Sequence, residues 1–182
     1  MTLSERRDQD PQALLRDVAA LAGEWTLDSP RSAVKLRTWH AWGRKPVDGV
    51  FRTVAGQGTV TPDGKISGTL SVGAASIDTD HAKRDKHLLG RHFLAVEQYP
   101  DIVFELDAIT PDADRVNVAG TLTVRDRTLP ISFPAQVSVS AGEVTLDGVV
   151  LIDRGDFGIT HNILGISGME NTLTLHAVFT KR

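Results

Sequence analysis

The sequence contains no cysteine, which excludes disulfides and thiol chemistry but leaves the redox compartment open. No run of apolar residues approaches the length of about 20 residues that a membrane-spanning helix needs. The formal net charge is −3, and without a basic excess the chain is not expected to bind nucleic acid as its main partner. Aromatic residues make up only 5% of the chain, so most of its apolar residues are aliphatic.

The first residues also lack the apolar core of about 7–15 residues that a secretory signal carries. Polar and charged side chains occupy that space in residues 1–9. The sequence therefore predicts a cytoplasmic protein. A leader that has already been removed is the alternative, against which Met1 argues.

The first regular pattern in the chain predicts a helix over residues 11–22. Asp10 is a suitable N-cap, and a proline follows it at the first helical position. Leu14, Val18 and Leu21 recur at helical spacing, and a glycine follows the last turn. We expect this helix to pack its apolar face on the rest of the chain, with a homodimer contact as the alternative.

From Trp25 onward, apolar and polar residues alternate with a period of two, which is typical of half-buried β-strands. The alternation is clearest near the C-terminus, where Leu173 and Leu175 are separated by threonine. Turn signals separate about eight or nine short strands. The chain therefore divides into a tail and helix, residues 1–22, and an all-β domain, residues 23–182. An antiparallel sandwich and an up-and-down barrel both fit this pattern.

One segment, residues 76–105, interrupts the strand pattern. Asp80 is predicted to cap a short helix over residues 80–90, and Gly90 is predicted to end it. Pro100 closes the segment before the alternation resumes. A helix of mixed polarity within an all-β chain is a candidate lid, plug or cavity wall.

This segment contains SIDT, then RDKHL, then the pattern F-x-x-V-E-x-Y-P-D-I-x-F. Two later blocks accompany it, LTVRDRTLPISFP over residues 122–134 and IDRGDFGI over residues 152–159, and GEWTLD lies near residue 25. Together these blocks resemble the YceI-like family of polyisoprenoid-binding proteins over roughly residues 23–181. The resemblance implies a lipocalin-like antiparallel barrel that holds an isoprenoid, such as a polyprenyl phosphate or a quinone, or a similar amphiphile.

A barrel of about eight strands has just enough interior to fill with side chains or to hold one small ligand. A wall of branched aliphatic side chains is expected to leave an apolar space that suits an apolar guest. The alternative is that the same side chains close-pack. The residues expected to line the cavity are Val34, Leu36, Phe51, Leu70, Val72, Phe104, Leu122, Val124, Ile131, Phe133, Leu173, Leu175 and Ala177.

Charged residues of the predicted central helix are candidates for the mouth of this cavity. Arg84, Asp85 and His87 would contact the polar head of a ligand there, Arg84 through two donors of its guanidinium group. Alternatively, Arg84 and Asp85 fix the helix to the barrel rim through ion pairs and hydrogen bonds. Trp39 and Trp42 are expected either to form an amphipathic lip that touches a membrane transiently or to cover one end of the core.

No arrangement typical of catalysis stands out. The sequence has no G-x-S-x-G nucleophile motif, no HExxH zinc motif and no phosphate-binding glycine loop. His81 and Asp85 lie one helical turn apart, a spacing that can hold a metal, but solvated or hydrogen-bonded histidines are the favoured interpretation. The turn at residues 154–156 is predicted to be a strand-end corner held by an Arg–Asp pair.

The sequence therefore predicts a protein without catalytic residues, metal or cofactor that binds, stores or transports a hydrophobic small molecule. One alternative is an enzyme that acts on a lipid-like molecule through His87 or Asp156. Another is a packed barrel that serves protein interaction. An elongated internal cavity would argue against the packed barrel, and titratable groups deep in that cavity would favour the enzyme.

Overall fold

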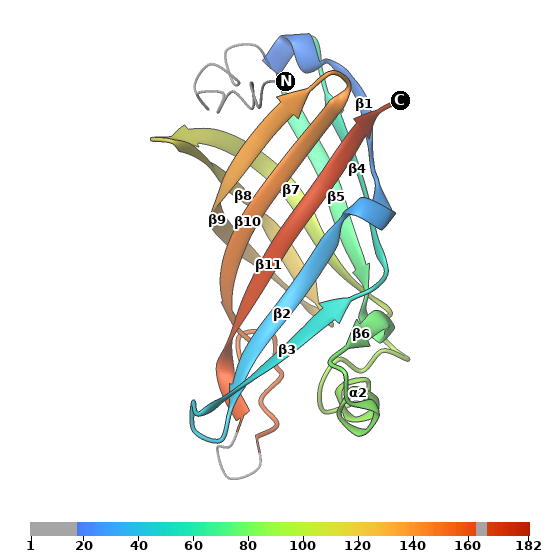
Figure 1. The fold of residues 1–182 in the computed structure, drawn as a ribbon, viewed down its shortest axis with the longest axis vertical. Coiled ribbons are helices and arrows are strands. Elements are labelled where there is room, and N and C mark those ends of the chain that lie inside the picture. The colour runs from blue at the N-terminus through green and yellow to red at the C-terminus, as the bar shows by residue number, and fades with distance from the viewer. Residues whose placement is uncertain (1–17, 163–166) are drawn as a thin grey trace, which may run out of the picture.

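The computed structural model describes residues 18–162 and 167–182, most of which lie in antiparallel strands (Figure 1). The strands are β1 (Gly23–Leu27), β2 (Ala33–His40), β3 (Lys45–Phe51), β4 (Val54–Val60), β5 (Ile66–Gly73), β6 (Ile77–Asp78), β7 (Asp101–Asp112), β8 (Arg115–Val124), β9 (Arg127–Ser140), β10 (Glu143–Asp153) and β11 (Ser167–Lys181). The helical elements are α2 (Ala82–Leu88) and three 3₁₀ turns, η1 (Val18–Leu21), η2 (Ser29–Arg31) and η3 (Ala74–Ser76).

Eight strands close into a barrel in the order β1-β4-β5-β7-β8-β9-β10-β11, because β1 pairs with both β4 and β11. All of these pairings are antiparallel. Closure gives every strand of the ring two neighbours, so these strands leave no open sheet edge along the ring. The predicted fold class is confirmed, and the structure selects the barrel over the sandwich.

Strand β11 is long enough to carry two partners along the same edge. Its C-terminal part pairs with β1, and its N-terminal part pairs with β2, which continues through β3 to β6. The 3₁₀ turn η2 separates β1 from β2, and there the hydroxyl of Ser32 accepts a hydrogen bond from the amide of Val178 at 3.0 Å. The sheet β2-β3-β6 thereby extends the barrel wall at the end opposite η1 (Figure 1).

The predicted helix of the central insert is confirmed, as α2, at the same end of the barrel as the turn between β2 and β3 (Figure 1). Its N-cap is His81 rather than the predicted Asp80, since the His81 Nδ1 accepts a hydrogen bond from the Arg84 amide at 3.3 Å. Asp80 instead has a φ of 58°, and its amide donates to the Asp78 carboxylate at 2.9 Å. Asp80, which was predicted as the N-cap, therefore belongs to the turn before the helix.

The predicted N-terminal helix lies largely outside the described residues, which begin with its last turn, η1. Val18 in this turn is buried with an exposed fraction of 6%, and it packs in one cluster with Trp25 and Val60. The indole Nε1 of Trp25 donates to the carbonyl of Leu21 at 3.0 Å. This last turn is therefore docked on the barrel end. None of the helices in the described part of the chain has the length and apolar character needed to cross a membrane.

Two glycines make room for a pair of aromatic rings inside the barrel. A Cβ atom at Gly120 would lie 2.6 Å from the ring of Phe104 and 2.2 Å from the carbonyl oxygen of Glu105. A Cβ atom at Gly148 would lie 2.8 Å from the ring of Phe133. The two ring centroids are 5.9 Å apart, at an interplanar angle of 60°. This pair, Phe104 and Phe133, divides the interior into two spaces.

Candidate ligand-binding site

The larger space is a cavity of about 390 Å³ between the Phe104–Phe133 pair and α2. All but one of the residues predicted to line a cavity lie on its wall, and their role in binding a ligand stays a prediction. The exception is Ala177, which is buried on the wall of a second cavity of about 160 Å³ nearer to η1. The interior is thus not close-packed, and its space is elongated along the barrel.

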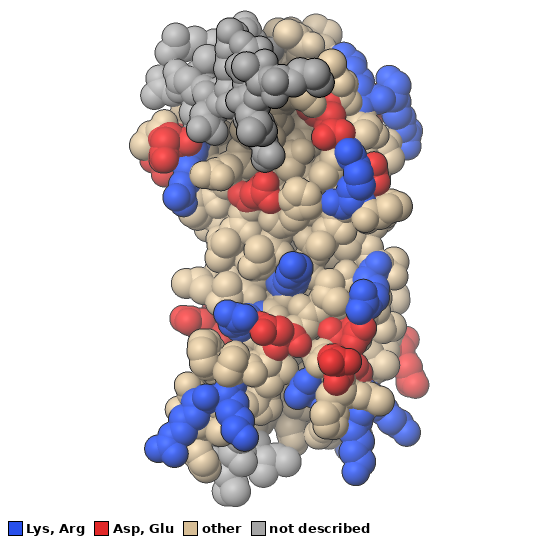
Figure 2. Space-filling model, in the orientation of Figure 1, with Lys and Arg blue, Asp and Glu red and all other residues tan. Residues whose placement is uncertain are grey.

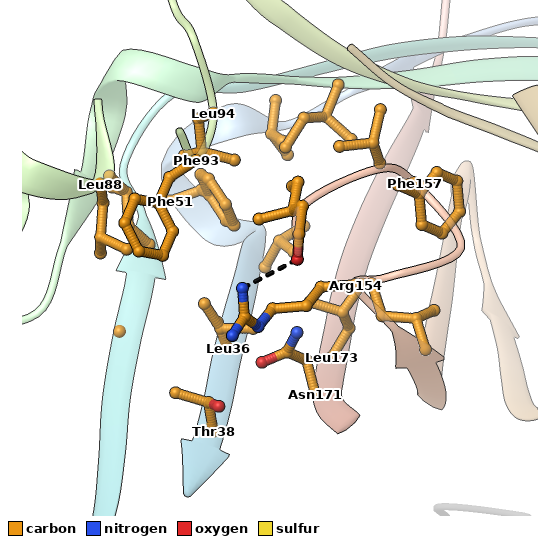
Figure 3. A pocket seen from close by; sticks show the side chains of 18 of the residues that line it. Leu36, Thr38, Phe51, Leu88, Phe93, Leu94, Arg154, Phe157, Asn171 and Leu173 are labelled. Atoms are coloured by element: carbon orange, nitrogen blue, oxygen red, sulfur yellow. Dashed lines mark hydrogen bonds between the residues drawn. The ribbon is translucent and has the colours of Figure 1, made fainter. Parts of the chain in front are cut away.

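The two cavities meet at a ring of four apolar side chains. Leu70, Phe104, Phe133 and Leu175 lie on the walls of both. The main cavity extends from this ring to α2 and the turn that follows it, where Leu88, Phe93 and Leu94 form part of the wall. Figure 3 shows these three side chains next to Phe51, which comes from β3. Elements far apart in sequence therefore combine into one apolar wall.

Arg84 and Asp85 form a hydrogen-bonded brace around Thr79, in the loop between β6 and α2. Arg84 donates through Nε to the Thr79 hydroxyl and through a terminal nitrogen to the Thr79 carbonyl, both at 2.7 Å. Asp85 accepts from the Thr79 amide at 3.1 Å and from its hydroxyl. Arg84 and His87 still lie on the cavity wall, whereas Asp85 does not. The geometry matches the structural alternative for Asp85.

The two tryptophans near the β2–β3 turn lie outside the cavity. Trp39 and Trp42 have exposed fractions of 42% and 71%, and neither lies on the wall. Alternation along β2 explains this placement, because Thr38 and His40 face inward and the residue between them faces outward. The rings therefore lie outside the cavity wall, and their part in a lip or in covering the core stays a prediction.

The sequence analysis missed the most deeply buried charged group on the wall. Arg154 follows the last residue of β10 and has an exposed fraction of 8%. Its guanidinium group donates to three backbone carbonyls: from Nε to Gly168 at 3.1 Å, and from Nη1 to Ile159 at 2.8 Å and to His161 at 3.1 Å. No ion pair joins it to an aspartate among the described residues, so the predicted Arg–Asp pair at this corner was wrong.

A signal for Arg154 was present in the sequence. Val150, Ile152 and Arg154 all line the cavity, so the arginine continues the inward-facing positions of β10 beyond the last strand residue. Asn171 stands in the same relation to Leu173, and Thr38 to Leu36. Figure 3 shows Thr38 and Asn171 close to Arg154, which makes this region the polar part of an otherwise apolar site.

Histidines add to the basic character of this end of the cavity. His40, His87 and His161 lie on the wall, and the His161 ring is 4.9 Å from that of His92. Burial lowers the pKa of His40, and the positive charges of Arg84 and Arg154 lower it further. Within residues 18–162 and 167–182, no group of three histidine or carboxylate side chains is arranged to hold a metal ion.

Of the two residues considered for acid–base catalysis, His87 lies on the cavity wall and Asp156 does not. Asp156 is exposed and does not lie on the wall. No aspartate or glutamate belongs to the wall formed by the described residues. His87 is exposed and lies at the α2 end, with its ring 5.2 Å from that of Phe93. The arrangement therefore offers an apolar container with basic groups at one end.

The structure thus defines a closed antiparallel barrel with a mostly apolar cavity inside it. The family model of the YceI-like domain matches residues 25–180, and the chain belongs to this family. Protein YceI of Escherichia coli O157:H7 is 30% identical over 125 residues, which is 65% of this chain and 64% of that protein. Protein YceI of Salmonella arizonae matches to the same extent. The matched region thus spans less than two thirds of these relatives.

Solved structures show the same fold. BcnA of Burkholderia cenocepacia has a TM-score of 0.75 at 23% identity, covering 84% of this chain and 98% of that one. A polyisoprenoid-binding domain from Saccharophagus degradans, implicated in plant cell wall breakdown, has a TM-score of 0.69 at 14% identity, covering 87% and 98%. The YceI protein of Campylobacter jejuni has a TM-score of 0.65 at 19% identity, covering 75% and 85%.

Proposed function

We propose that this protein binds and carries an amphiphile with a long apolar tail of the isoprenoid type, in the main cavity and without chemical change. The observation that carries the proposal is the cavity of about 390 Å³, whose wall is mostly aliphatic and aromatic with polar and basic residues toward one end. This volume falls within the range of about 300–1,000 Å³ that is usual for small-molecule sites. The similarity to a polyisoprenoid-binding domain supports an isoprenoid tail.

The energetics of burial suit such a tail. Removing apolar surface from water contributes about 0.8 kcal/mol for each buried methylene-sized group, so one five-carbon isoprene unit contributes about 4 kcal/mol at most. Non-covalent affinity levels off near about −18 to −21 kcal/mol. A few buried units would therefore approach the limit. Selection among longer tails then depends on the length of the cavity rather than on added affinity.

Exchange of the ligand at a membrane surface fits the outer features of the α2 end. Trp42 is the most exposed of the large hydrophobic residues in the described chain and is followed by the exposed Arg44 and Lys45. Indole rings suit the boundary between water and lipid, and basic side chains are attracted to anionic headgroups. Figure 2 shows lysine and arginine side chains at this end of the molecule. We propose a transient contact here, with the carrier otherwise in water.

Native mass spectrometry of the purified protein, followed by lipid extraction, tests the proposal directly. We expect a mass increment that is released as an extractable prenyl lipid, and we expect added farnesol to displace a fluorescent fatty-acid probe. Val150→Trp, which places a large ring on the cavity wall, should weaken binding of the probe. The matched variant Val149→Trp should not, because Val149 is 49% exposed on the outer face of β10.

The proposal fails if the protein binds neither prenyl nor alkyl probes, or if both tryptophan variants bind them as well as the unmodified protein does. A melting curve for each variant shows whether it has folded. Turnover of a lipid or ester probe by the protein, abolished in His87→Ala with the fold intact, would instead establish the enzyme alternative.

A further inference from the structure

Among the described residues, the wall of the main cavity carries a buried cation and no buried anion. Arg154 is more than nine-tenths buried, and three backbone carbonyls hold its guanidinium group through Nε and Nη1. The remaining nitrogen, Nη2, is buried and has no hydrogen-bond partner among the described residues. Figure 3 shows the guanidinium group beside Leu36, Leu173 and Asn171, within the pocket. A residue on the wall of the main cavity therefore holds a buried donor that no described residue satisfies.

Such a group is costly without a partner. A buried polar atom that lacks a hydrogen bond is destabilising, and an unpaired buried charge more so. Burial lowers the pKa of Arg154, but an arginine side chain stays protonated at neutral pH. The ring of Phe93 lies 5.9 Å from the guanidinium carbon and offers only weak compensation. The site as it stands lacks a strong acceptor.

The other ionisable groups on the wall have the same sign. Arg84 is the second permanent cation, and His40, His87 and His161 are the titratable groups. Among the described residues, no carboxylate belongs to the wall, although the whole chain carries a net charge of −3. A low-dielectric cavity that contains only basic groups favours a negatively charged guest over a neutral one.

We propose that the cavity selects amphiphiles with an anionic head, a carboxylate or a phosphate, and that Arg154 binds this head inside the barrel. The tail then extends from Arg154 toward the Phe104–Phe133 pair. Thr38 and Asn171, which also lie on the wall near Arg154, are placed to add hydrogen bonds to the head. This inference rests on the proposed function, because it assigns the polar end of the same ligand.

The geometry prefers Arg154 to Arg84 as the principal anchor. Arg84 donates hydrogen bonds from two of its nitrogens to Thr79 and belongs to the brace that fixes α2. Arg154 presents a nitrogen that no described residue uses, in a more buried place where water competes less. A charge-assisted hydrogen bond is stronger than a neutral one, and low exposure weakens its screening by salt.

Matched probes with one tail and two heads test the inference. Farnesyl phosphate and farnesol share a tail, as do palmitate and hexadecanol, and each is titrated by calorimetry or probe displacement. We expect each anion to bind about 10- to 100-fold more tightly than its alcohol, since hydrogen bonds to a charged group contribute about 1.5–3 kcal/mol. Arg154→Met should abolish the preference and largely spare the alcohols, whereas Arg84→Met should retain it.

Two milder variants test the same inference if Arg154→Met does not fold. Arg154→Lys keeps the charge but loses the forked geometry, and it should retain a reduced preference for the anion. Thr38→Val removes one hydroxyl with little change in shape. It should weaken binding of the anion several-fold more than binding of the alcohol.

Equal affinity of the unmodified protein for anion and alcohol would overturn the inference and leave the proposed function standing. An undiminished preference in a folded Arg154→Met would overturn the role of Arg154. If no probe of either kind binds, the proposed function itself has failed, so the two failures are distinguishable.

Discussion

We predict that the Phe104–Phe133 pair limits the length of the tail that the barrel accepts. The variant Phe104→Ala tests this prediction. Phe104 lies on the walls of both cavities, with its ring against Phe133 and over Gly120. Removing the ring should join the space of about 390 Å³ to that of about 160 Å³. The variant should then accept a tail that the unmodified barrel excludes.

Phe104→Ala is expected to change two free energies, that of unfolding and that of ligand binding. Replacing a core phenylalanine by alanine usually costs about 3–5 kcal/mol of stability, and we expect about 3 kcal/mol because Phe104 already borders empty space. Each further isoprene unit that becomes buried contributes up to about 4 kcal/mol. At about 1.4 kcal/mol per tenfold change, one added unit should improve affinity for the variant by up to about 10²- to 10³-fold. In the unmodified protein the same unit should improve affinity little.

The assay is competition binding with farnesyl, geranylgeranyl and longer prenyl phosphates, or with the matching alcohols. Leu106→Ala serves as the control, because Leu106 lies on the wall of the smaller cavity alone. Its loss enlarges that cavity without opening the ring between the two. The same dependence of affinity on tail length in folded Phe104→Ala and in the unmodified protein would refute the idea that this pair sets the limit.

Four further changes test the framework around the site. Gly120→Ala should lower the melting temperature sharply, since a Cβ atom would lie 2.2 Å from a backbone oxygen; an unchanged melt would refute this close approach. The lowered pKa of His40 means that the unfolded chain takes up a proton at its ordinary pKa of about 6.5 while the folded chain resists it, so stability should fall as the pH drops below this value. His40→Phe should remove that part of the pH dependence, as measured by denaturant unfolding at several pH values. Val18→Asp should destabilise the protein by about 3 kcal/mol, because it would bury a charge against the barrel end; wild-type stability would show that this turn contributes nothing. Arg84→Ala should cost about 1–3 kcal/mol by leaving the Thr79 carbonyl and hydroxyl short of donors, and retained stability with a loss of binding would identify Arg84 as the head-group residue instead.

The period-two pattern was sufficient to place the predicted strand residues other than Ala177 on the wall of the main cavity. Residues such as Leu36 and Leu173 face inward because β-strand side chains alternate between two faces, and this alternation does not depend on which strands pair. Closure is different, since it requires β1 and β11 to meet across most of the chain length. Composition and period do not specify that long-range pairing, and the resemblance to a family was needed to choose a barrel.

Trp39 lies outside the cavity, as the alternation of side chains along a β-strand requires. The prediction for Trp39 did not apply this alternation. Leu36, Thr38 and His40 share one face of β2, so the strand that correctly predicted Leu36 also places Trp39 outside. Trp39 was expected instead at an amphipathic lip or over one end of the core. The structure continues β2 through His40, and the actual turn begins at Ala41, which has a φ of 51°.

Arg154 illustrates a stronger limit on reasoning from a single sequence. Its inward position follows from Val150 and Ile152, but an arginine next to two aspartates is more simply interpreted as an exposed ion pair at a corner. What distinguishes the two interpretations is the fold of the chain after the turn, which brings the carbonyls of Ile159 and Gly168 to the guanidinium group. Those carbonyls hold the arginine in the interior, and no carboxylate of the described residues lies on the wall to compensate its charge. The backbone, rather than an acidic side chain, satisfies most of its hydrogen-bond donors. Its positive charge is therefore not neutralised, and an anionic ligand could neutralise it. In the proposed role of Arg154, this single charge, which composition does not reveal, would give the guest a preferred orientation.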